Sequence, residues 1–193
     1  MKTSPLQLEW IAYPKVSIES NAQSEELDSF LETNVRAVVH YMANGRHFAR
    51  VSIDGVSSES APYQLAVEAV SCFSFDASLA KQAYGLNDRL PYVLAANVSR
   101  IIYASAREFV SMIMSRAPGG VAMIRSIIIE PGDVEISSDV SAETILRDVF
   151  QIEQVGVEAT QSAEGGSLPA ASKPRATAAA RATSESKGKK VRK

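Results

Sequence analysis

The sequence predicts an α+β fold in which a four-stranded antiparallel sheet carries a long helix on one face. Four segments with alternating apolar and polar residues come first, and residues 90–116 then repeat their apolar positions every three to four residues. The connections between the four segments are short, which favours antiparallel pairing. An apolar crossover loop and a second, shorter helix complete the prediction.

The four strands are predicted at residues 6–19, 31–42, 47–56 and 62–75. Pro14 interrupts the first of them and indicates an edge strand or a bulge. Asn44-Gly45 separates the second from the third and is a strong hairpin signal. His40 and His47 flank this turn, where we expect both side chains to be solvated.

The apolar stripe of the predicted helix is wider than the roughly 100° that packing on one sheet requires. We therefore expect a second copy of the chain to cover part of it, which predicts a homo-oligomer. The expected oligomer interface contains Ile101, Ile102, Phe109, Met112 and Ile113. Arg107 and Glu108 lie on the polar side, either in interface ion pairs or on a solvated face.

Residues 121–134 follow the break at Pro118-Gly119-Gly120 and predict an extended, apolar crossover. Extended backbone sends alternate side chains to opposite sides, so one side can be buried while the other lines a groove. The alternative is that all of these side chains belong to the core and the subunit interface. The candidate groove contains Phe48, Tyr63, Val121, Met123, Ile124, Ile127, Ile128, Ile129 and Phe150. Asp139 or Ser141 is expected to cap the second helix.

The chain divides by composition into a domain at residues 1–156 and a tail at residues 157–193. Residues 161–193 carry eight Lys or Arg against two Glu, whereas the remainder carries 12 basic against 20 acidic residues. The tail has too few large apolar residues to offset its ordering entropy, so we expect disorder. It is either a solubilising extension or an electrostatic arm for RNA, anionic lipid or an acidic partner.

Several functional classes are not expected. The sequence contains no run of about 18 apolar residues, so no membrane span is predicted. The N-terminus has no apolar stretch of the kind found in secretory signals. A single cysteine, Cys72, fits a reducing cytoplasm. Two histidines and one cysteine supply no metal-site or nucleophile pattern, so neither a metal, nor a cofactor, nor an enzymatic activity is predicted.

The chain resembles the SecB export-chaperone family over about residues 6–155. The resemblance lies in Cys72-Phe73, Leu90-Pro91-Tyr92, Ala106-Arg107-Glu108, Ser115-Arg116 and the crossover at residues 127–134. It implies a dimer of dimers that binds non-native polypeptides without ATP, with protein export as one role. The family's exposed Leu and Glu, which help to dock the motor ATPase SecA, correspond to Gln64 and Ala66 here, so SecA docking is doubtful.

The leading hypothesis is therefore a holdase that binds unfolded polypeptides in the apolar groove. One alternative is a SecB-like chaperone dedicated to a single partner, such as an antitoxin. The other is an oligomeric nucleic-acid-associated protein that acts through its basic tail.

Overall fold

The computed structural model describes residues 4–20, 30–56, 63–85, 88–116 and 123–152. Val121, the Pro118-Gly119-Gly120 break and the whole predicted tail lie outside these residues. The described residues all belong to the first of two compact units, which spans Met1–Gly156.

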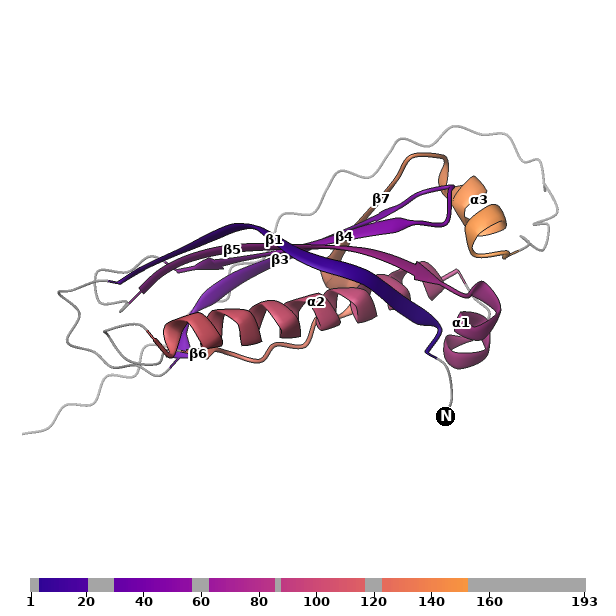
Figure 1. Cartoon of the computed structure of the whole chain (residues 1–193). Helices are drawn as coiled ribbons and strands as arrows, with labels where there is room; N and C mark the ends of the chain where they lie inside the picture. Colours follow the sequence, from indigo (N-terminus) through magenta and orange to yellow (C-terminus); the bar gives the residue numbers. More distant parts are fainter. Residues whose placement is uncertain (1–3, 21–29, 57–62, 86–87, 117–122, 153–193) are drawn as a thin grey trace, which may run out of the picture. The chain divides into compact units, whose positions relative to one another are not determined.

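A five-stranded sheet forms the body of this unit, with the strand order β1-β5-β4-β3-β7 (Figure 1). The strands are β1 (Leu6–Ser20), β3 (Thr33–Tyr41), β4 (His47–Gly55), β5 (Tyr63–Phe75) and β7 (Val134–Ser138). The first four pair antiparallel, as predicted, whereas β7 pairs parallel with β3 from Ala37↔Val134 to Tyr41↔Ser138. The fifth strand was not predicted, because it is short and follows the crossover directly.

Helix α2 (Leu90–Met114) packs along one face of the sheet, which confirms the predicted fold class (Figure 1). The strands turn alternate residues toward this helix, as their period-two pattern requires. The core between sheet and helix contains Ala37, Val39, Tyr41, Ala49, Val51, Ile53, Leu65, Val67, Phe73, Leu94, Val98, Ile102, Ala106 and Val110. Each large aliphatic side chain buried in this core contributes about 1.5–3 kcal/mol of transfer free energy.

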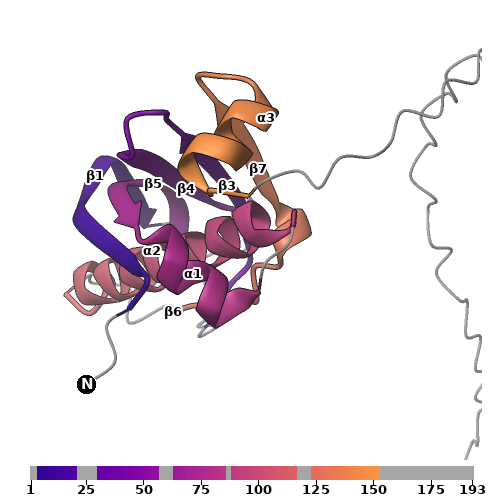
Figure 2. The same cartoon turned by 90° about the vertical axis from the view of Figure 1, so that its right-hand side faces the viewer.

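Two short helices lie at one end of the sheet (Figure 2). Helix α1 (Ala77–Tyr84) was not predicted, and its N-cap Asp76 accepts a hydrogen bond from the Leu79 amide at 2.9 Å. Helix α3 (Ala142–Thr144) continues as a π-helical turn, η2 (Ile145–Val149), and is the predicted second helix. Ser141 caps α3, whereas Asp139 accepts a hydrogen bond from the Ala43 amide at 3.2 Å.

The crossover returns from the far end of α2 to the sheet. Strand β6 (Met123–Ile124) pairs parallel with β2 (Phe30–Leu31). Residues 125–130 then run without a partner strand to the 3-10 turn η1 (Pro131–Asp133), which leads into β7. This unpaired segment is the part of the crossover that bears on function.

Candidate functional site

The crossover contains both buried and exposed isoleucines. Ile124 and Ile129 are each 3% exposed and belong to the core. Ile127 is 40% exposed and Ile128 is 78% exposed, more than any other large apolar side chain among the described residues. Two adjacent isoleucines therefore face solvent, whereas the isoleucines before and after them in the crossover are buried.

Side chains from α2 hold this segment in place. The Arg100 Nε donates to the Ile129 carbonyl at 2.8 Å, and the Tyr103 hydroxyl donates to the Arg125 carbonyl at 2.5 Å. The Arg107 guanidinium donates to the Ser126 hydroxyl. Carbonyls that lack a partner strand must find donors elsewhere, and these donors come from one side of the helix. We call this set, Arg100, Tyr103 and Arg107, the α2 clamp.

The sequence suggested two positions for Arg107, an interface ion pair or a solvated face. In the structure its side chain instead contacts Ser126 of the crossover in the same subunit. Burial raises the pKa of the Tyr103 phenol, which keeps its proton available for the hydrogen bond. The clamp thus fixes the backbone on both sides of Ile127 and Ile128. Ile127 and Ile128 are therefore exposed from a backbone whose flanking carbonyls are held by hydrogen bonds.

A cavity of about 260 Å³ opens between the crossover and β3. Its walls are Val35, Ala37, Ile127, Ile128, Ile129 and Asp133. β3 pairs with β7 only from Ala37 onward, so in the described part of the chain residues 33–36 have a strand partner on the β4 side alone. The cavity therefore adjoins an open strand edge in line with β7.

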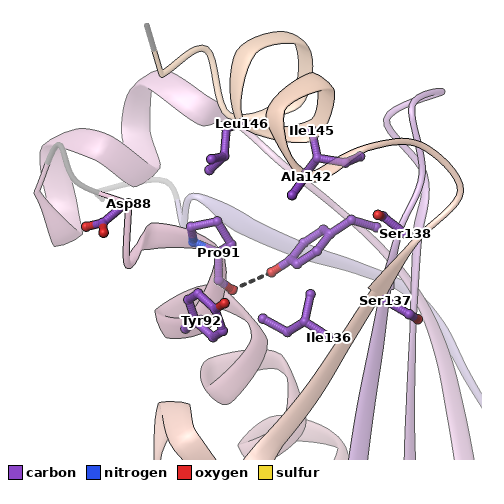
Figure 3. A pocket seen from close by; sticks show the side chains of 10 residues that line it. Asp88, Pro91, Tyr92, Ile136, Ser137, Ser138, Ala142, Ile145 and Leu146 are labelled. Atoms are coloured by element: carbon purple, nitrogen blue, oxygen red, sulfur yellow. Dashed lines mark hydrogen bonds between the residues drawn. The ribbon is translucent and has the colours of Figure 1, made fainter. Parts of the chain in front are cut away.

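A second cavity, of about 350 Å³, lies at the other end of β7 (Figure 3). Its lining consists of Tyr41, Asp88, Pro91, Tyr92, Ile136, Ser137, Ser138, Ala142, Ile145 and Leu146. The Tyr41 hydroxyl donates to the Pro91 carbonyl at 2.6 Å, and burial raises the pKa of this phenol. The sequence did not predict this cavity, because its walls come mainly from β3, α2, β7 and the α3–η2 turn, which lie far apart in the sequence.

The predicted groove residues do not all meet. Phe48 lies on the sheet face opposite α2, with its ring centroid 6.3 Å from that of Trp10. Tyr63 and Phe150 are buried in the core, the latter with its ring centroid 5.1 Å from that of Tyr41. Met123 is 42% exposed in β6. Of the predicted groove residues that the structure describes, Ile127, Ile128 and Ile129 are the ones that meet at one cavity.

The predicted interface residues also divide. Ile101 is 44% exposed and Met112 is 56% exposed on the outer side of α2. Ile102 is fully buried against the sheet, so it belongs to the subunit core. Phe109 stacks on Tyr13 at 4.2 Å between ring centroids, and Ile113 is half-buried.

His47 differs from the prediction that both histidines are solvated. His47 is 1% exposed, and its Nδ1 accepts a hydrogen bond from the Met42 amide at 3.1 Å. Burial lowers the pKa of His47 to about 4. His40 is hydrogen-bonded through Nδ1 to the Ser137 hydroxyl at 2.9 Å.

Within the described ranges, no group of three or more His, Cys, Asp or Glu side chains is arranged to hold a metal ion. Cys72 is buried, and this burial raises the pKa of its thiol. No helix among the described residues has the length and apolar character needed to cross a bilayer.

Comparison with known proteins gives a structural likeness. No protein-family model and no curated protein matches the chain. Among solved structures, it matches the Mycobacterium tuberculosis Rv1957 SecB-like chaperone in complex with a ChAD peptide from the Rv1956 HigA1 antitoxin. The chain is similar in structure to a SecB-like chaperone. The match covers 63% of this chain and 91% of the other, with 14% sequence identity and a TM-score of 0.43.

Proposed function

We propose that the protein is an ATP-independent chaperone that holds non-native polypeptides on the outer side of the crossover. The observation that carries this proposal is Ile128, an isoleucine held 78% exposed on clamped backbone. A single exposed apolar residue needs no explanation. Ile127 beside it, 40% exposed, extends the apolar area. The adjoining cavity, lined also by Val35 and Asp133, lies next to both isoleucines, and we call these three features together the crossover surface.

The energetics favour weak, repeated binding. A client side chain buried on the crossover surface contributes about 1.5–3 kcal/mol, from which association and ordering costs are subtracted. One such site binds weakly. Several copies in an oligomer, acting on one long client, bind tightly through effective concentration. The proposed dimer of dimers, assembled through the outer side of α2 with Ile101 and Met112, provides those copies.

The open edge of β3 suits clients of varied sequence. An extended peptide beside residues 33–36 could pair with main-chain groups, which every residue offers. Its alternate side chains would then meet the cavity walls at Val35 and Ile127. The cavity at the other end of β7 could accept a further apolar side chain. Recognition of this kind requires extended, unfolded segments and rejects native ones.

The proposed role does not include SecA docking. Gln64 is exposed and Ala66 is half-buried on β5, and neither supplies a carboxylate. We propose action in the cytoplasm, either on many clients or on one dedicated partner such as an antitoxin. Both use the crossover surface.

The test is suppression of client aggregation by the full chain without ATP. Dilution of chemically denatured citrate synthase into buffer, followed by light scattering, should show suppression. Ile128→Asp should remove most of it, whereas Tyr84→Asp, at an apolar residue 38% exposed on α1, should not. Absence of suppression by the wild type, or equal loss in both variants, would contradict a general holdase.

A dedicated chaperone would give a different result. It would leave citrate synthase aggregation unchanged but protect its own partner, again in an Ile128-dependent way. If neither client type depends on Ile128, the crossover surface is not the binding site.

A further inference from the structure

We propose that the crossover surface selects extended segments with an apolar centre, an acidic side chain at one end and a basic side chain at the other. This inference rests on the proposed function. Residues 125–133 read Arg-Ser-Ile-Ile-Ile-Glu-Pro-Gly-Asp. The exposed isoleucines thus lie between a cationic end and an anionic end of the same segment.

The cationic end consists of Arg125 and Arg107. Arg125 is exposed, and its guanidinium carbon lies 5.8 Å from the centroid of the Phe30 ring. Arg107 reaches the neighbouring residue, Ser126, from α2. None of the four ion pairs found among the described residues includes either arginine. Both charges therefore remain available to a client carboxylate.

The anionic end consists of Glu130 and Asp133, which cap the η1 turn reciprocally. Asp133 Oδ2 accepts from the Glu130 amide at 2.8 Å, and the Glu130 carboxylate accepts from the Asp133 amide. Each carboxylate keeps further acceptor sites, since two oxygens offer about four lone-pair directions. Neither is in an ion pair within the described part of the chain, and Asp133 also lines the cavity beside Ile127 and Ile128.

The two ends act on different parts of a client. Arg125 and Glu130 are five residues apart along the unpaired segment. Extended backbone rises about 3.3 Å per residue, so these two residues are on the order of 16 Å apart. The Debye length at physiological ionic strength is about 8 Å. Each end is therefore screened from the other, and a uniformly basic peptide gains attraction at one end while it meets repulsion at the other.

Exposed charge pairs of this kind change affinity modestly, by on the order of two- to fivefold for each end. A segment that satisfies both ends should bind roughly 4- to 25-fold more tightly than an uncharged one if the two effects are additive. At 1 M salt, where the Debye length is about 3 Å, this difference should nearly vanish.

The experiment uses fluorescent nine-residue peptides with one fixed apolar centre and the full-length protein. The first peptide has uncharged ends. Two peptides carry Asp and Lys at opposite ends, one in each order. A fourth carries both charges at the same end, and a fifth carries Lys at both ends. Fluorescence anisotropy gives each dissociation constant. The opposite-end peptide, in at least one order, should bind most tightly.

Double-mutant cycles then assign the ends. Arg125→Gln should weaken binding only when the peptide carries Asp, and Asp133→Asn, which keeps an oxygen acceptor for the cap, only when it carries Lys. Lys15→Gln on β1 is the control for net charge. If the uncharged peptide binds but the charged ends change nothing, or if the all-Lys peptide binds best, this inference is wrong while the proposed function stands. If no peptide binds, both fail.

Discussion

Removal of the Tyr103 hydroxyl should loosen the crossover without unfolding the protein. The Tyr103→Phe variant keeps a ring that is 4% exposed and loses only the donor to the Arg125 carbonyl, 2.5 Å away. A typical hydrogen bond contributes about 1 kcal/mol net. The form in which the crossover is detached from α2 should therefore become about fivefold more populated. A loss of about 1 kcal/mol has this effect because 1.4 kcal/mol corresponds to a factor of ten. Water can reach the released carbonyl on an exposed segment, so global stability should fall by no more than this amount.

Limited trypsin digestion measures this opening directly, because the clamped segment begins at Arg125. When opening is fast relative to cleavage, the cleavage rate follows the population of the open form. Tyr103→Phe should raise the rate of cleavage after Arg125 about fivefold, as followed by mass spectrometry. Tyr13→Phe is the matched control, since it removes a phenolic hydrogen bond to Ser105 on α2, 2.8 Å long, but leaves the crossover untouched. Equal rates for the two variants would refute the role assigned to the clamp.

Three further predictions concern assembly, the tail and pH. Met112→Lys places a charge on the outer side of α2 and should lower the mass of the oligomer measured by light scattering. An unchanged mass would show that this side of α2 is not in the interface. Truncation after Gly156 should preserve the suppression of aggregation, whereas its loss would make the tail the binding element. The pKa of His47 is lowered from 6.5 to about 4 in the folded state, so the unfolded chain binds more protons between these values and stability should fall as pH drops from about 6.5 to 4. The fall should reach about 1–2 kcal/mol between pH 7 and pH 5 in urea unfolding. It should be absent in His47→Gln; an equal fall in that variant would contradict this origin.

The strands and the long helix were predictable because their periodicity is strong. In β4, Ala49, Val51 and Ile53 alternate with polar residues, and all three face α2. The long apolar repeat starting at Leu90 gave the start of α2 correctly. In contrast, α1 buries only Ala77 and Ala80, so it leaves little apolar periodicity to detect.

The candidate site was predictable in part. The apolar pattern predicted an extended crossover, but alternation along it does not predict that the adjacent Ile127 and Ile128 are both exposed. The position of Phe48 also followed from that pattern, since a residue between His47 and Ala49 must face away from α2; its assignment to the groove was therefore inconsistent with the predicted strand. The clamp was not predictable, because its hydrogen bonds join α2 to a non-periodic segment through contacts that depend on the three-dimensional course of the chain.

Photo-cross-linking from the crossover tests the location of the client most directly. A p-benzoylphenylalanine residue replaces Ile128 in one variant and Phe48, 38% exposed on the opposite face of the sheet, in the other. With a urea-denatured client diluted into buffer, position 128 should form cross-links and position 48 should not, and a native client should form none at either. Cross-links of equal yield at the two positions, or only at position 48, would contradict binding at the crossover surface.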